Sequence, residues 1–217
     1  MIKNTLLYQV LFICSIGFAQ TPKQSYFEWT TMPFSKEELK ERRAKLMETL
    51  PNKGIVLIPA KDGFSHGETF RQLDDFYYFT GLELPNSLLA IDLTDNNVVV
   101  FVPESDKRFE SASRPNDFPG MPFLSDSSIS SESGLSLKNI ADFKTFLTEK
   151  SVEGVTILVN SGRVGDIVYG SEDYITTFSP VQQLLHLIRS KHQGLQFANS
   201  YEAIAKVRMI KSEAEIE

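Results

Sequence analysis

Short apolar runs alternate along this chain with segments in which apolar residues recur every three or four positions. Continuous apolar runs bounded by turn residues predict strands, and they occupy residues 55–58, 76–80, 87–93, 98–102 and 155–159. Periodic segments predict helices, and they occupy residues 35–50, about 136–149, 180–191 and about 200–209. Strands that alternate with helices indicate a layered α/β fold.

The connection between two of these strands predicts how the sheet is built. Residues 87–93 and 98–102 are separated by Thr94-Asp95-Asn96-Asn97, which has the residue types of a tight hairpin turn. A hairpin joins antiparallel strands, whereas a strand–helix–strand connection joins parallel ones. We therefore predict a mixed β-sheet. Residues 103–135 are rich in Pro and then in Ser, and we predict a long excursion there with one short element.

Two predicted helix starts carry the S-x-x-E pattern of a capping box, in which a Ser hydroxyl and a Glu carboxylate satisfy first-turn amides reciprocally. Ser35 and Glu38 open the predicted helix at 35–50. Ser212 and Glu215 open a second helix close to the end of the sequence, although an isolated helix needs roughly a dozen residues in water. The pattern alone leaves open whether a longer helix continues beyond residue 217.

Composition limits the possible size and partners of the protein. A chain of 217 residues, 41% of them hydrophobic, can bury a substantial core in one large domain or two small ones. The formal net charge of −6 gives no support to a nucleic-acid partner. The basic residues of Lys40-Glu41-Arg42-Arg43 are interleaved with acids, and we interpret them as a solvated helix face.

The first 19 residues have the organisation of a secretory signal peptide. Lys3 supplies a positive amino end, residues 6–18 are mostly apolar, and Gly17-Phe18-Ala19 has the small-x-small pattern of a cleavage site. The apolar run is shorter than the roughly 20 residues of a membrane span. We predict cleavage near Ala19 and an exported protein, periplasmic or secreted, that begins at Gln20.

Cleavage at this point removes the only cysteine, Cys14. A lipid anchor on Cys14 is the weaker alternative, because Ile13 is large where a small residue is required. With cleavage near Ala19, the mature chain would have no thiol, disulfide or cysteine ligand for a metal. We predict that residues 20–34 form an extended polar lead-in.

Residues with catalytic potential do not form a recognisable constellation. The sequence has no G-x-S-x-G, P-loop or G-x-G-x-x-G motif. Of the three histidines, His186 and His192 lie six positions apart, unlike the i, i+4 pair of a zinc helix. The adjacent Asp74 and Asp75 we interpret as turn-capping residues rather than as metal ligands. We predict no catalytic residue and no bound metal in this chain.

The segment ETFRQLDDFYYFTGLELPNSLLAIDL, residues 68–93, is more distinctive. It resembles the amino-terminal domain of aminopeptidase P (Xaa-Pro aminopeptidase), of the creatinase and prolidase group of "pita-bread" metallopeptidases. The family pattern places an Arg-Gln pair, a Phe, an aromatic pair, a Phe-Thr-Gly and a Pro before an apolar strand. The matching residues are Arg71, Gln72, Phe76, Tyr77, Tyr78, Phe79, Thr80, Gly81 and Pro85.

Two further segments agree with this family. Residues 40–50 resemble its opening Arg-rich helix, and residues 207–217 resemble the R-x-x-K-S-x-x-E-I junction that leads into its catalytic domain. The resemblance implies a three-layer α/β domain with a mixed β-sheet over residues 35–210. The family's catalytic domain follows this junction, so the resemblance implies that residues 211–217 begin a linker or helix into a domain that these 217 residues do not contain. In the family that domain binds two divalent metals, often manganese, through two Asp, one His and two Glu. None of these ligands maps onto the present chain.

The resemblance also implies a function. The chain would be the amino-terminal, non-catalytic part of an exported Xaa-Pro aminopeptidase, which releases the residue that precedes proline at a peptide's amino end. This part would shape the substrate entrance and oligomer contacts. Its partners would be proline-containing peptides, the enzyme's own catalytic domain and further copies of the chain in a homo-oligomer.

Four residues are candidates for the substrate entrance or an interface: His66, Arg71, Tyr77 and Tyr78. In the strand predicted at 76–80, the two tyrosines point to opposite faces, one to the core and one to a cleft or partner. Arg71 would bind a peptide carboxylate or, as we favour, pair with Asp74 or Asp75. His66 lies in a polar loop next to Gly67. It could line an entrance, but we favour a solvent-exposed histidine without such a role.

Two other functions remain open at this point. The first is a stand-alone, non-catalytic module that binds peptides or proteins. The second is a fragment of a prolidase or creatinase, which share the architecture. The Arg-Gln pair and the FYYFTG run favour aminopeptidase P.

Overall fold

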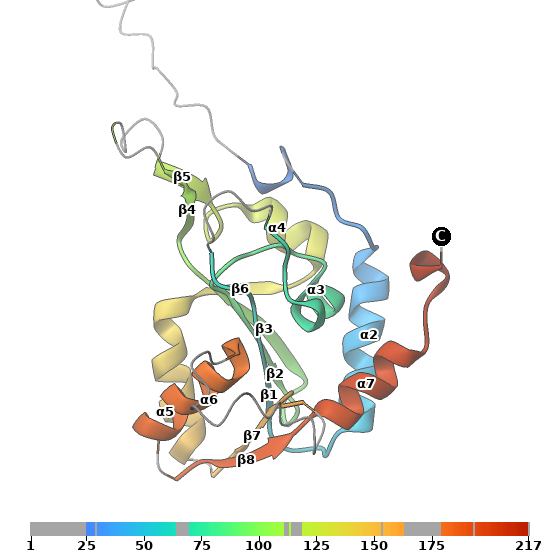
Figure 1. The fold of residues 1–217 in the computed structure, drawn as a ribbon, viewed down its shortest axis with the longest axis vertical. Coiled ribbons are helices and arrows are strands. Elements are labelled where there is room, and N and C mark those ends of the chain that lie inside the picture. The colour runs from blue at the N-terminus through green and yellow to red at the C-terminus, as the bar shows by residue number, and fades with distance from the viewer. Residues whose placement is uncertain are drawn as a thin grey trace, which may run out of the picture.

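A six-stranded sheet forms the centre of the computed structural model, in the spatial order β6-β3-β2-β1-β7-β8 (Figure 1). The structure describes residues 25–28, 30–63, 70–110, 113, 119–152, 154–162, 179–192 and 194–216. In spatial order the strands are β6 (Ser136–Asn139), β3 (Asn97–Val102), β2 (Leu88–Asp92), β1 (Ile55–Pro59), β7 (Thr156–Val159) and β8 (Gln196–Asn199). Strand β2 is antiparallel to β1 and β3, and the other pairings are parallel. The mixed sheet is therefore confirmed.

Helices cover both faces of this sheet (Figure 1). One layer contains α2 (Lys36–Thr49), α3 (Asp74–Thr80), α4 (Ser127–Ser133) and α7 (Tyr201–Met209), and the other contains α5 (Phe143–Val152) and α6 (Pro180–Lys191). Each face of the sheet has its own hydrophobic core: the first lies under α2, α3, α4 and α7, and the second under α5 and α6. The side chains of β1 alternate between them, with Val56 and Ile58 in the first core and Ile55 and Leu57 in the second. The predicted three-layer α/β architecture is confirmed.

Residues 76–80 lie in helix α3, so their prediction as a strand is wrong. A six-residue aromatic run has too few positions to separate a helical from a strand period. Asp74 and Asp75 occupy the first turn, where negative charge is favourable. Gly81 ends the helix with φ 67°, in the left-handed conformation common at helix ends.

Substituting Gly81 with alanine is expected to destabilise the fold by more than the same change at Gly154. Both glycines have positive φ, +67° and +65°, so both substitutions carry the left-handed strain of about 1–2 kcal/mol. A Cβ at position 81 would also lie 3.0 Å from side-chain atoms of Leu39 and Met32, whereas position 154 is open. Thermal unfolding of both variants would measure the difference, and equal losses would contradict the packing at Gly81.

The helix predicted at 136–149 begins later than expected. Residues Ser136–Asn139 form β6, which pairs with β3, and a 3-10 turn η2 (Ile140–Asp142) precedes α5. Asn139 caps that turn by accepting a hydrogen bond from the amide of Ala141. Strand β8 was not predicted, because its polar, largely exposed sequence has no apolar run.

The excursion at 103–135 contains more structure than the single short element predicted. Strands β4 (Ser105–Glu110) and β5 (Pro119–Pro122) form a separate antiparallel pair. Helix α4 follows, and its cap Asp126 accepts hydrogen bonds from the backbone and side chain of Ser128. The burial of Ile129 joins α4 to the first core.

Part of the predicted extended lead-in is folded onto the domain. It contains the 3-10 turn η1 (Tyr26–Glu28), and Tyr26 is buried. The backbone N–H of Tyr26 donates to Asp126 over 2.7 Å, and its hydroxyl accepts from the amide of Glu83 over 2.7 Å. Burial raises the pKa of Tyr26 to about 12. This segment therefore belongs to the folded unit.

The predicted signal peptide, residues 1–19, and the candidate His66 lie outside the described residues. Within the described part of the chain, none of the helices is long and apolar enough to cross a membrane.

Candidate functional site

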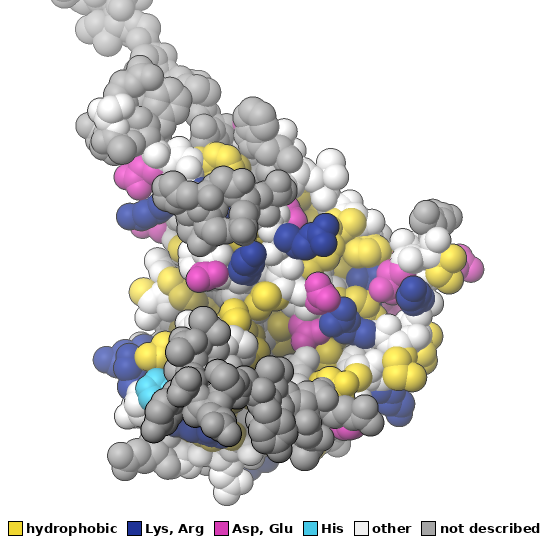
Figure 2. Space-filling model, in the orientation of Figure 1, with side chains coloured by type: hydrophobic (Ala, Val, Ile, Leu, Met, Phe, Trp, Pro, Cys, Tyr) yellow, Lys and Arg dark blue, Asp and Glu magenta, His cyan; other side chains and the backbone are white. Residues whose placement is uncertain are grey.

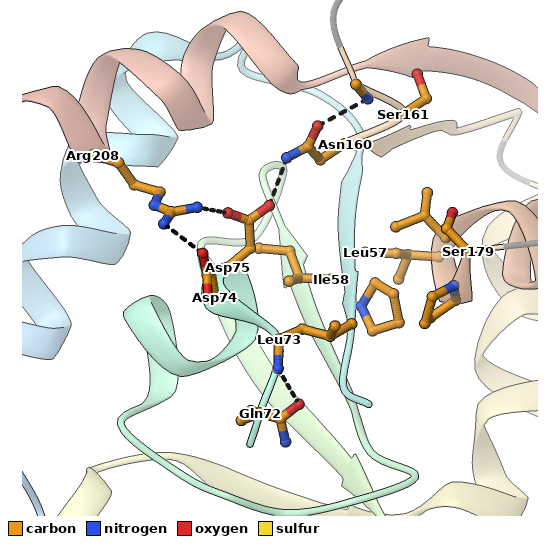
Figure 3. A pocket seen from close by; sticks show the side chains of 14 residues that line it. Leu57, Ile58, Gln72, Leu73, Asp74, Asp75, Asn160, Ser161, Ser179 and Arg208 are labelled. Carbon is orange, nitrogen blue, oxygen red and sulfur yellow. Dashed lines mark hydrogen bonds and ion pairs between the residues drawn. The ribbon is translucent and has the colours of Figure 1, made fainter. Parts of the chain in front are cut away.

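A cavity of about 510 Å³ opens where β1 and β7 end (Figure 3). Its walls come from these two strand ends, from the first turns of α3 and α6, and from Arg208 of α7. The two strands are parallel neighbours, so the cavity lies outside the carboxyl ends of parallel strands. Ligands in open α/β sheets commonly bind at this place.

The polar side of the cavity is organised around Asp75. Its two carboxylate oxygens accept hydrogen bonds over 2.6 Å from Arg208 Nη1 and from Asn160 Nδ2 (Figure 3). Asp74 lies 3.4 Å from Arg208 Nη2. These contacts connect α3, α7 and the residues that follow β7. The acidic pair of the sequence is therefore in a helix's first turn and binds a distant arginine.

The charge balance of this cluster limits what the cavity can hold. Two carboxylates surround one guanidinium, so the cluster carries more negative than positive charge, and Arg208 is already engaged. It suits a neutral or cationic group better than a phosphate. Within the described residues, no group of three or more His, Cys, Asp or Glu could hold a metal ion. In the view of Figure 2, basic and acidic side chains of the described residues are interspersed.

Gln72 of the Arg-Gln pair is a buried structural residue. Its side-chain oxygen accepts hydrogen bonds from the amides of Lys61 and Leu73 at 2.7 and 2.8 Å, and its nitrogen donates to the carbonyl of Leu84 at 3.1 Å. One side chain thus connects the segment after β1 with both sides of α3. Without this side chain, these partly or fully buried backbone groups would lose these hydrogen bonds.

The structure separates the remaining candidate residues. Tyr78 is buried, and its hydroxyl donates to the carbonyl of Val207 at 3.3 Å. Tyr77 is half-buried, and burial together with the charge of Glu83 raises the pKa of its hydroxyl. Since both lie on a helix, they do not point to opposite faces as a strand would require.

Arg71 is exposed at the edge of the motif. The carboxylates of Asp74 and Asp75 pair with Arg208, so the favoured pairing with Arg71 is not present among the described residues. The roles of Arg71 and Tyr77 at an entrance or interface stay predictions.

Arg42 and Arg43 are both 4% exposed, so their prediction as part of a solvated helix face is wrong. Their guanidinium groups donate to the carbonyls of Tyr78 and Phe79, at 3.1 and 2.7 Å, near the end of α3. Carbonyls in the last turn of a helix have no partner within that helix. Burial lowers the pKa of Arg43 to about 10.

Arg42 is also held between two aromatic rings. Its guanidinium carbon lies 3.9 Å from the ring centre of Phe34 and 4.3 Å from that of Tyr78. Sequence patterning could not identify these two buried arginines, because the carbonyls and rings that bind them come from other segments. The resemblance of residues 40–50 to the family's opening helix was the available signal.

Comparison with known proteins supports the three-layer α/β fold described above. Residues 39–111 match the family model described as "Aminopeptidase P, N-terminal domain". No curated protein matches the sequence. Among solved structures, a putative aminopeptidase P from Bacillus anthracis has a TM-score of 0.65 at 18% identity, over 84% of this chain and 42% of that chain.

Two further solved structures agree. Aminopeptidase PepP from Pseudomonas aeruginosa has a TM-score of 0.60 at 21% identity, over 86% of this chain and 41% of its own. Icp55 from Saccharomyces cerevisiae has a TM-score of 0.55 at 22% identity, over 85% of this chain and 39% of its own. The chain thus spans about two fifths of the length of these structures. Residues 39–111 match the aminopeptidase P amino-terminal domain family, and the chain has the fold of the amino-terminal part of aminopeptidase P enzymes.

Proposed function

We propose that this chain is the amino-terminal, non-catalytic part of an exported Xaa-Pro aminopeptidase, which releases the residue preceding proline from a peptide. The observation that carries the proposal is the family match over residues 39–111. This segment includes both buried arginines, α3 and the β2–β3 hairpin. The match therefore covers part of the first core as well as the aromatic motif.

The chemistry of hydrolysis belongs, in this proposal, to a catalytic domain that follows the present residues. Two divalent metals there, manganese in our proposal, would activate a water molecule and polarise the scissile carbonyl. The bond before proline is a tertiary amide without an N–H, and it restricts the conformation of the preceding residue. A site dedicated to this bond is physically reasonable for that reason.

The present domain would shape the substrate entrance and contribute to contacts between subunits. Exposed Arg71 and half-buried Tyr77 are available for such contacts, and the cavity beside Asp75 is close to the start of the same helix. The interior position of Tyr78 gives it a supporting role behind that surface. Export with cleavage near Ala19 completes the proposal.

Immunodepletion from source cells tests this function. An antibody raised against the 217-residue chain is expected to remove chelator-sensitive hydrolysis of an Xaa-Pro-Xaa tripeptide from the exported fraction. The immunopurified protein is expected to begin at Gln20. A non-immune antibody of the same class serves as the control.

Two results would contradict the proposal. The first is full retention of tripeptide hydrolysis after the protein has been removed. The second is hydrolysis of the tripeptide by the purified 217-residue chain itself, since no residue of this chain is proposed as catalytic.

A further inference from the structure

The segment after α7 folds back onto α2 through a compact polar cluster. Figure 1 shows α7 crossing α2, with the short turn η3 (Glu213–Glu215) beside the amino-terminal half of α2. Ser212 and Glu215 form the capping box predicted from the sequence, so the turn has its own local hydrogen bonds. The amide of Ile216 continues it by donating to the carbonyl of Glu213.

The contact with α2 is made by the side chain of Glu38. Its carboxylate accepts a 2.5 Å hydrogen bond from the hydroxyl of Ser212, which lies 174 positions away in the sequence. The backbone N–H of Glu38 donates to the hydroxyl of Ser35, which is one half of the predicted capping box. The carboxylate of Glu38, however, turns to Ser212 and Arg42 rather than back to its own helix start.

Arg42 lies between the carboxylates of Glu38 and Glu215. Its Nη2 lies 2.5 Å from Glu38 and 3.4 Å from Glu215. The same guanidinium packs against the rings of Phe34 and Tyr78 and donates to the carbonyl of Tyr78, contacts that do not depend on the turn. A fixed, buried cation thus presents one face to the segment after α7.

The electrostatics of Glu38 agree with this geometry. Its partial burial alone would raise the pKa of the carboxyl group. The hydrogen bonds from Ser212 and Arg42 and the charges of Arg42 and Lys45 outweigh that effect, so the pKa is lowered. The ionised carboxylate is therefore the form that the cluster stabilises.

We propose that Glu38, Arg42, Ser212 and Glu215 form a junction lock, which holds residues 212–216 against α2 in one fixed direction. The lock goes beyond the proposed function, because it concerns how this domain orients the segment that follows it. Its use in an enzyme rests on that function: the lock would set the angle between this domain and the catalytic domain. These four are positioning residues and take no part in the chemistry.

The exposed apolar side chains around the lock fit this role. Met209, Ile210 and Ile216 are 81%, 73% and 72% exposed, and they lie immediately before and after the locked turn. A turn held at both its serine and its glutamate keeps these side chains in a defined arrangement. A free segment would present them in many arrangements, with a loss of conformational entropy on any later contact.

Hydrogen exchange in the 217-residue chain tests the lock without reference to any peptidase activity. In Glu38→Ala, the amides of residues 212–216 are expected to exchange at least about tenfold faster than in the unaltered chain, because a charge-assisted hydrogen bond is lost. The amides of β2 are expected to be unchanged. Glu37→Ala is the matched control, since Glu37 is an exposed acid in the same helical turn.

A second pair of variants covers the case in which Glu38→Ala unfolds the domain. Ser212→Ala removes the hydroxyl that meets Glu38, whereas Ser212→Thr retains one. We expect faster exchange of residues 212–216 in Ser212→Ala and near-normal exchange in Ser212→Thr. Unchanged exchange in both alanine variants, with β2 intact, would overturn the lock and leave the proposed peptidase function untouched.

Discussion

Replacing Phe79 with alanine is expected to lower the free energy of unfolding by about 3–5 kcal/mol. The ring is fully buried in the first core and makes an edge-to-face contact with Tyr78, with 5.0 Å between ring centres. Its removal forfeits the transfer of a large apolar group from water and leaves a cavity between the helices and the sheet. The carbonyl of Phe79 also accepts from Arg43, so a shift of α3 would strain a buried hydrogen bond.

Urea unfolding followed by circular dichroism would measure this loss. Phe109→Ala is the matched control, because Phe109 is 46% exposed on β4 and its removal is expected to change stability by no more than about 0.5 kcal/mol. Similar losses for the two variants would contradict the placement of α3 in the core. The pair of variants therefore tests the burial of Phe79 in the first core.

Replacing Arg42 with methionine is expected to destabilise the domain by about 3 kcal/mol. Methionine retains much of the apolar stem but removes the cation. The carboxylates of Glu38 and Glu215 then lose their shared positive partner, and the carbonyl of Tyr78 loses its donor. Breaking a buried ion pair from one side is costly, because it leaves the partner charge uncompensated.

The control for this variant lies one helical turn away. Lys45 pairs with Glu41 over 2.8 Å at the surface, where both side chains are more than half exposed. Lys45→Met is expected to leave the unfolding midpoint unchanged, because exposed pairs contribute little. An Arg42→Met protein as stable as Lys45→Met would show that the buried arginine is not needed to satisfy the end of α3.

The elements that the sequence pattern predicted well are those whose period is clear. Helix α6 was predicted at residues 180–191, where the structure places it. Its Ser179 and Gln182 form a capping box, and Pro180 occupies the first turn. The apolar runs of β1, β2, β3 and β7 identified the central strands, and the turn at 94–97 identified their antiparallel hairpin. Each of these signals is local.

The elements that were missed depend on tertiary contacts. Strand β8 is an edge strand whose residues are mostly exposed, so no apolar run identifies it. Strand β6 is similarly polar and is held by its pairing with β3. The direction of the Glu38 carboxylate could not be predicted either, because Ser212 lies 174 positions away.

The candidate site shows the same division. The resemblance identified the motif at 68–93, of which residues Asp74–Thr80 form α3 in the structure. It did not identify Asn160 or Arg208 as the partners of Asp75, since these residues follow β7 and lie on α7. Local sequence supplied the acidic pair, and only the folded chain supplies what binds it.

The size of the native polypeptide tests the central claim most directly. We would probe source cells with an antibody against this domain and compare the band with the 24.5 kDa calculated for the 217 residues. Solved aminopeptidase P chains are more than twice as long as the region they share with this one. The account predicts a band at about twice 24.5 kDa or slightly above. A single band slightly below 24.5 kDa would contradict it and would indicate a free-standing module.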